Sequence, residues 1–142
     1  MSFQNQFTKT TTDANLMETV HHGSAEYPFR YYYENIALFD FKCIDWHWHS
    51  ELEFIYIESG NVVFDIGTVH FELNEGNGIM INSKILHRLQ SSSDAIIPNF
   101  LFQPSFIAPQ DSLIYKKYIN PVISSSLEYL VFQPDIPWQK KA

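Results

Sequence analysis

Residues 47–60 have the sequence HWHSELEFIYIESG, and this stretch decides which fold we expect. Successive side chains of a β-strand point to opposite faces, so His47, His49, Glu51 and Glu53 would share one face. The same face continues with two isoleucines and therefore points into an apolar interior. A carboxylate buried there needs a metal ion, a histidine or water as a partner.

The segments on both sides of this stretch also predict strands. Apolar runs separated by short turns occupy residues 36–44, 46–59, 62–66, 69–73, 78–81, 86–90 and 95–103. The third and fourth runs flank a Gly-Thr turn and predict a β-hairpin. Six or more short strands with regular turns indicate an antiparallel sandwich or barrel.

The two ends of the chain differ from this middle zone. Residues 1–24 have few apolar positions and predict a flexible arm. Residues 111–119 predict a short helix with Asp111 as its N-cap, and residues 127–133 predict one more strand. A further helix opens at Asp135, and because barely one turn follows, we expect the protein to continue. The expected division is an arm at 1–24, a barrel at 25–134 and the start of a linker helix at 135–142.

The composition of the chain limits the functions that it can have by itself. The formal net charge of −7 and the isoelectric point of about 5.2 indicate that this chain by itself binds DNA poorly, because nucleic-acid affinity comes largely from lysine and arginine. The single cysteine, Cys43, excludes an intramolecular disulfide. Neither a membrane-spanning run nor a signal peptide is indicated by the sequence. We expect a cytoplasmic protein without membrane contact.

The histidine-rich stretch resembles the first motif of the cupin family, which is His-x-His, three residues, Glu, six residues and Gly. The chain matches this motif from His47 to Gly60, and residues 76–87 are similar to the second cupin motif. The glycine usually found six residues before the first histidine is Phe41 here. Cupins often hold a divalent ion such as Zn, Fe, Mn or Ni through three histidines and a glutamate. The resemblance implies that the matching ligands are His47, His49, Glu53 and His87.

A longer resemblance is to the N-terminal sensing domain of AraC-type transcription regulators. It is carried by residues 47–90, by residues 115–126 and by the helix opening at Asp135. It implies a mainly β fold, a cupin-type double-stranded β-helix or jelly-roll barrel with short C-terminal helices. It also implies a small-molecule effector in the barrel, a homodimer, and DNA binding through a C-terminal domain that is not in this chain.

The residues leave several alternatives open. The four candidate ligands could hydrogen-bond one another without a metal ion, and Glu51 could replace Glu53 if a bulge shifts the register. Tyr31 and Tyr33, from a run of three tyrosines, are candidate ligand contacts in a pocket wall. The runner-up to a sensor is a free-standing metal-dependent cupin enzyme, an oxygenase or isomerase, although no catalytic residue is assigned. A binding protein without a regulatory role is a further alternative, and the sequence does not identify the effector.

The remaining histidines and two tryptophans are expected outside the site. His21, His22 and His70 are expected at the surface, His70 without an acidic partner at ligand spacing. Trp46 and Trp48 would lie on the strand face opposite the histidines, so we expect them to pack beneath another sheet or a helix.

Overall fold

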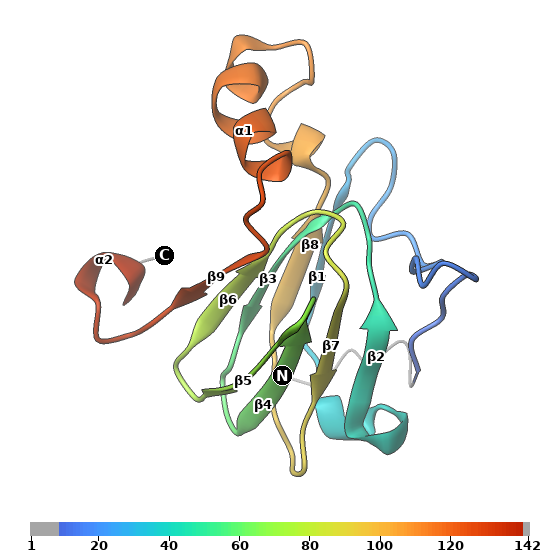
Figure 1. The fold of residues 1–142 in the computed structure, drawn as a ribbon, viewed down its shortest axis with the longest axis vertical. Coiled ribbons are helices and arrows are strands. Elements are labelled where there is room, and N and C mark those ends of the chain that lie inside the picture. Colours follow the sequence, from blue (N-terminus) through green and yellow to red (C-terminus); the bar gives the residue numbers. More distant parts are fainter. Residues whose placement is uncertain (1–8, 141–142) are drawn as a thin grey trace.

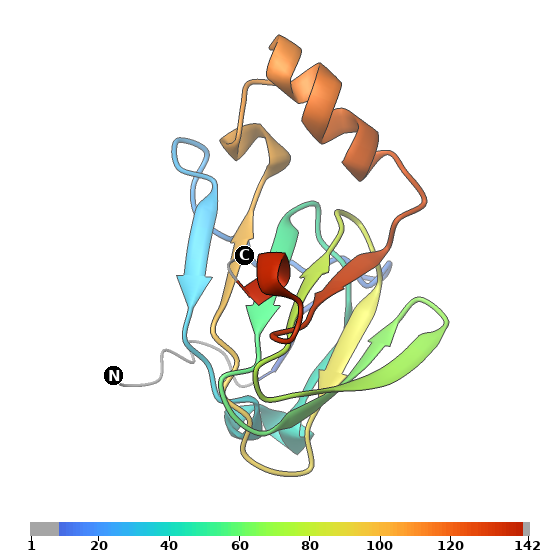
Figure 2. The same cartoon turned by 90° about the vertical axis from the view of Figure 1, so that its left-hand side faces the viewer.

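Two antiparallel sheets face each other and form a jelly-roll barrel (Figure 1, Figure 2). The computed structural model describes residues 9–140, and within them nine strands are present. The first sheet has the order β1-β8-β3-β6-β9, with the bounds Phe29–Tyr32, Asn99–Phe102, Leu52–Tyr56, Gly78–Ile81 and Tyr129–Phe132. The second sheet has the order β2-β7-β4-β5, with the bounds Cys43–His47, His87–Gln90, Asn61–Ile66 and Val69–Asn74. Strands far apart in the sequence therefore lie side by side, as in double-sheet jelly rolls.

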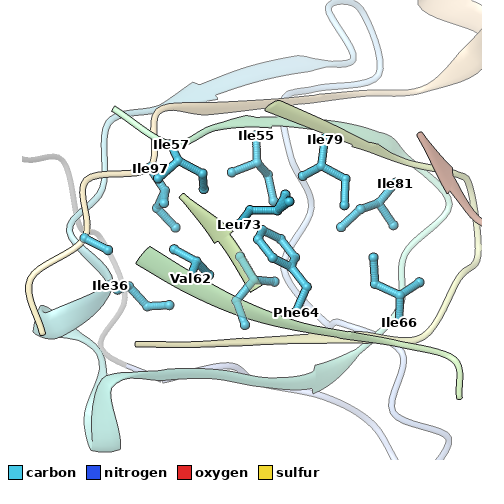
Figure 3. Packing of buried hydrophobic residues seen from close by; sticks show 12 residues of the cluster. Ile36, Ile55, Ile57, Val62, Phe64, Ile66, Leu73, Ile79, Ile81 and Ile97 are labelled. Carbon is cyan, nitrogen blue, oxygen red and sulfur yellow. The ribbon is translucent and has the colours of Figure 1, made fainter. Parts of the chain in front are cut away.

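The space between the sheets is filled mainly by branched aliphatic side chains (Figure 3). Alternate residues of β4, namely Val62, Phe64 and Ile66, are fully buried and face Ile55 of β3 and Ile79 of β6. Each such side chain contributes about 2 kcal/mol when it leaves water, so this alternation fixes the register of β4. The predicted hairpin is confirmed, because β4 pairs with β5 along its whole length.

One predicted strand, residues 36–44, is wrong in its first part. Two short 3-10 turns, η1 (Ile36–Leu38) and η2 (Asp40–Lys42), precede β2, which begins only at Cys43. Within the second turn Phe41 takes the left-handed conformation, with φ of 60° and a side chain that is 99% exposed. Glycine adopts this conformation without steric cost. The backbone therefore explains why the cupin motif usually has a glycine at this position.

The single strand expected over residues 46–59 is two strands that belong to different sheets. β2 ends at His47 in one sheet, and β3 begins at Leu52 in the other. A distant segment holds the connection in place, because Ser83 Oγ donates a hydrogen bond of 2.6 Å to the carbonyl of Ser50. Side chains before and after this connection therefore reach the interior from opposite sheets.

Short helical segments lie between β8 and β9 and after β9. The elements are η3 (Pro104–Phe106), η4 (Tyr115–Ile119), α1 (Asn120–Ile123) and α2 (Pro137–Lys140). η4 and α1 form a continuous helical run at one end of the barrel (Figure 1). The predicted cap Asp111 is wrong, since the backbone N–H of Tyr115 donates to Ser112 Oγ at 3.2 Å. Within residues 9–140, no helix is long and apolar enough to cross a membrane.

Candidate ligand and metal site

Three histidines and a glutamate meet inside the barrel. His47 ends β2, His49 lies in the following connection, Glu53 is in β3 and His87 begins β7. One ligand atom of each residue lies within 4.8 Å of those of the other three, and all four residues are buried. The sequence predicted that His47, His49 and Glu53 meet because they share one face of a single strand. In the structure the cluster is instead formed by residues from both sheets. That these four residues bind a ligand or a metal ion stays a prediction.

The backbone fixes the orientation of all three imidazoles. The Nδ1 atoms of His47 and His87 each lie 2.7 Å from a backbone carbonyl two residues earlier, and Nδ1 of His49 lies 3.1 Å from the carbonyl of Glu51. A carbonyl only accepts hydrogen bonds, so Nδ1 carries the proton and donates in each case. The Nε2 atoms can then contact Glu53 or bind a ligand or a cation.

Glu53, and not Glu51, is the carboxylate of this cluster. Oε2 of Glu53 lies 3.2 Å from Nε2 of His49 and 3.2 Å from Nε2 of His87. Glu51 is also buried, but its carboxylate approaches only Nδ1 of His49, at 3.9 Å. The alternative in which a bulge exchanges the two glutamates is therefore not the arrangement in this structure.

Burial and mutual contact shift the titration of the cluster. Burial alone would raise the pKa of Glu53, but hydrogen bonds with His49 and His87 outweigh it and hold this pKa well below its usual range. Burial alone would lower the pKa of His49, but the hydrogen bond and the charge of Glu53 raise it to about 9. Burial and the neighbouring His87 lower the pKa of His47 to about 3. Near pH 7 the cluster thus holds a carboxylate beside a charged His49 and a neutral His47.

The donor set of this cluster fits a divalent transition-metal ion. Three imidazole nitrogens and one carboxylate oxygen suit ions such as Zn, Fe, Mn or Ni. The carbonyl partners at Nδ1 are the supporting contacts that metal-binding histidines usually have. The four residues could therefore hold a metal ion, whose positive charge would replace the proton that otherwise balances Glu53.

The N-terminal segment lies across the histidine-bearing chain. The backbone N–H of Trp48 donates to the carbonyl of Leu16 at 3.0 Å, and the N–H of Glu18 donates to the carbonyl of Trp48 at 2.9 Å. The indole N–H of Trp48 donates to the carbonyl of Asn15 at 2.9 Å. We expected Trp48 to pack beneath a sheet or a helix, but it is the arm that binds this residue. Residues 1–8 of the expected arm lie outside the described part of the chain.

The arm inserts the side chains of Glu18 and His22 into the cavity beside the cluster. A hydrogen bond joins His22 Nε2 and the carboxylate of Glu18. His22 Nδ1 and the hydroxyl of Tyr32 share a hydrogen bond of 2.6 Å. The prediction of a surface position for His22 is therefore wrong, because the arm turns this residue inward and buries it. With the arm in place, the free volume of the cavity is only about 50 Å³.

The predicted tyrosine contacts lie elsewhere. Tyr31 lines a second, open pocket on the five-stranded sheet, beside Phe54 and Phe100. The hydroxyl of Tyr33 donates to the carboxylate of Glu58 at 2.5 Å. The middle tyrosine of the run, Tyr32, is the one that lines the histidine cavity. Ligand contacts by the two outer tyrosines stay predictions.

The surroundings of the other two histidines, His21 and His70, differ from the prediction in one respect. His21 and His70 are exposed, as expected. His70 nevertheless has an acidic partner, because its Nδ1 lies 2.5 Å from Oδ1 of Asp65. Asp65 also accepts hydrogen bonds from Arg88, whose guanidinium lies over the ring of Trp46. This network lies outside the histidine cavity.

A buried glutamate of the cavity wall should make stability depend on pH. Burial raises the pKa of Glu34 to about 7, although Asn99 Nδ2 donates a hydrogen bond of 2.9 Å to Glu34 Oε1. Because the folded pKa is raised above its ordinary value of 4.5, stability is full below pH 4.5 and falls as pH rises through 7. The loss expected from this group is about 3 kcal/mol.

Glu34→Gln should remove this loss, since glutamine keeps the acceptor for Asn99 and cannot ionise. We expect the variant to be about 2–3 kcal/mol more stable than the wild type at pH 8 and similar to it at pH 4.5, as measured by urea denaturation. Glu75→Gln, at an exposed turn position, is the control and should follow the wild type at both pH values. Equal stability of Glu34→Gln and the wild type at pH 8 would contradict the prediction.

The barrel and its buried cluster define a cupin-type domain, as the sequence predicted. The family model for the AraC-like ligand binding domain matches residues 38–108, half of the chain, and the chain belongs to this family. The chain is also similar to the uncharacterized HTH-type transcriptional regulator YdeC of Bacillus subtilis (strain 168), with 32% identity over 131 residues. This match covers 90% of the chain but only 44% of that relative, so the chain spans less than half of its length.

The chain is also similar to solved cupin structures. An RmlC-like cupin from Shewanella frigidimarina is 16% identical, with a TM-score of 0.48 over 71% of this chain and 87% of that one. A predicted oxalate decarboxylase from Thermotoga maritima is 17% identical, with a TM-score of 0.47 over 72% of this chain and 99% of that one.

Proposed function

We propose that this domain is the effector-sensing part of an AraC-type transcription regulator that works in the cytoplasm. The proposal rests on the position of the arm, which covers the histidine cavity and places Glu18 and His22 inside it. Pockets for small organic ligands are usually about 300–1,000 Å³, much larger than the space left under the arm. An effector can therefore enter only if the arm moves, and this requirement couples ligand binding to the conformation of the protein.

The proposed mechanism is a population shift. An effector that binds better to one arrangement of arm and barrel makes that arrangement more frequent, by no more than its difference in affinity. In this proposal residues 25–134 form the sensing barrel, and residues 135–142, of which 141 and 142 lie outside the described part of the chain, begin a linker helix toward a DNA-binding domain outside this chain. The regulator relative, which is more than twice as long as the match, supports this division. We propose a homodimer, in which the arrangement of the barrels sets how two DNA-binding domains are presented.

We also propose that His47, His49, Glu53 and His87 hold a divalent ion such as Zn, Fe, Mn or Ni. The common orientation of the three imidazoles, fixed by backbone carbonyls, supports this proposal. When bound, the ion would supply a Lewis-acidic centre for an oxygen atom of the effector. Family membership favours sensing over catalysis, so we place the ion in ligand recognition.

Limited proteolysis tests the coupling between ligand and arm. Lys9 is the only lysine or arginine before Arg30, so trypsin cleavage after Lys9 reports on the arm. Thr10 accepts a hydrogen bond from the backbone of Asp45, and cleavage at this bond therefore requires the arm to detach. We expect at least one compound of a metabolite library to change the cleavage rate several-fold, read by mass spectrometry. A rate that is the same with every compound would contradict the proposal.

A further inference from the structure

Glu18 is an unusual residue for a surface arm. Its side chain is only 12% exposed, although the neighbouring arm residues are largely open to solvent. Main-chain hydrogen bonds to Trp48, the residue between His47 and His49, set the position of Glu18. The arm is thus fixed on the histidine motif itself, and it brings a carboxylate there.

The cavity receives this carboxylate favourably. Burial alone would raise the pKa of Glu18, but the hydrogen bond with His22 outweighs burial and lowers it. Glu18 and His22 line one cavity together with His47 and His49. His22 also contacts the ring of His49, with centroids 5.9 Å apart and an edge-to-face geometry. A cavity that is lined by imidazoles and holds a buried carboxylate is suited to an anion, and here the chain's own side chain occupies it.

We infer that the effector is a small carboxylate, and that Glu18 occupies the position of the effector's carboxyl group when the arm is closed. This inference rests on the proposed sensing function and names the class of its ligand. The arm is then a resident competitor, which a free carboxylate displaces. A neutral ligand that displaces Glu18 would leave this imidazole-lined cavity without an anion, whereas a free carboxylate supplies one.

Propionate is the matched probe, because it reproduces the side chain of glutamate as a free molecule, and propionamide is its neutral isostere. Binding can be followed by NMR titration of the histidine ring signals in the wild type, in Glu18→Gln and in Glu26→Gln. Glu26 is exposed and does not line the cavity, so its variant is the matched control. All titrations are repeated with a chelator and with added Zn²⁺, to separate the anion site from the metal site.

If the arm is closed about nine-tenths of the time, only about a tenth of the wild-type molecules can bind a ligand in the cavity. Glu18→Gln weakens the closed state, so propionate should bind this variant about tenfold more tightly than the wild type. Glu26→Gln should bind propionate like the wild type, and propionamide should gain nothing from Glu18→Gln. In the wild type, propionate should also accelerate tryptic cleavage after Lys9.

Two results would overturn the inference. If propionate and propionamide gain equally from Glu18→Gln, Glu18 only holds the arm in place. If propionate binds the wild type and Glu18→Gln equally, there is no competition for one position.

A neutral compound such as glucose, tested in the same proteolysis assay, distinguishes the carboxylate inference from the proposed sensing function. An arm that responds to neutral compounds and not to acids would overturn the carboxylate inference while the sensing function stands, whereas an arm that responds to neither would overturn both.

Discussion

Glu53→Ala is expected to lower the free energy of unfolding by about 3–4 kcal/mol at pH 7, the cost usually found when one partner of a buried ion pair is removed. Oε2 of Glu53 contacts both His49 and His87 at 3.2 Å, and all three residues are buried. Without the carboxylate of Glu53, a charged His49 is left with the more distant carboxylate of Glu51, 3.9 Å from its Nδ1, and must either stay poorly paired or give up its proton. Both outcomes cost free energy that the wild type does not lose.

Urea denaturation in the presence of a chelator measures this effect without a contribution from metal ions. Glu72→Ala, on the exposed face of β5, is the control and should change stability by less than about 0.5 kcal/mol. A loss below about 1 kcal/mol for Glu53→Ala would show that the pair contributes little and would contradict the prediction.

The same pair also predicts how the difference varies with pH. The pKa of His49 is raised from 6.5 to about 9, so the stabilisation from its proton is complete below pH 6.5 and disappears as pH rises through 9. The stability difference between the wild type and Glu53→Ala should therefore shrink between pH 7 and pH 10.

The sequence predicted which residues of the barrel meet, but not the path by which they meet. Alternation along one strand placed His47, His49 and Glu53 on a common face. In the structure the strand is interrupted, because the backbone of Ser50 is bound by Ser83, which lies 33 positions away. Such a contact has no local signal, since it depends on how distant segments are brought together by the sheets. The chemistry of the cluster was predictable because residue type and motif spacing do not depend on that path.

The arm shows the opposite case. Residues 9–24 carry little apolar surface, so hydrophobic periodicity gave no reason to place them against the barrel. Their contacts include main-chain hydrogen bonds to Trp48 and the hydrogen bond between Glu18 and His22, and neither produces a pattern in hydropathy. The one available signal was the spacing of an acid and a histidine four residues apart. That spacing alone is common on surfaces and acquires meaning only through the cavity beneath it.

His87→Ala is expected to lower the affinity for Zn²⁺ at least about a hundredfold, since four-ligand zinc sites bind with about 10–16 kcal/mol and each ligand contributes a substantial share. His87 is the one ligand from the second motif, and its Nδ1 is held by the carbonyl of Ile85 at 2.7 Å. Competition with a chromophoric chelator measures the affinity, and His70→Ala is the control, because His70 is exposed, contacts Asp65 and lies outside the cluster.

The stability of the two proteins gives an independent measurement of the same site. A ligand that binds only the folded state stabilises it in proportion to the logarithm of its concentration, so Zn²⁺ should raise the melting temperature of the wild type and of His70→Ala, but not of His87→Ala. Equal affinity in all three proteins would place the ion elsewhere. If the wild type does not bind Zn²⁺, Fe²⁺, Mn²⁺ or Ni²⁺ at micromolar concentration, the four residues act as a hydrogen-bonded network. In that network the proton shared by His49 and Glu53 takes the place of the ion. The carboxylate of Glu18 would then contact histidine and no metal ion.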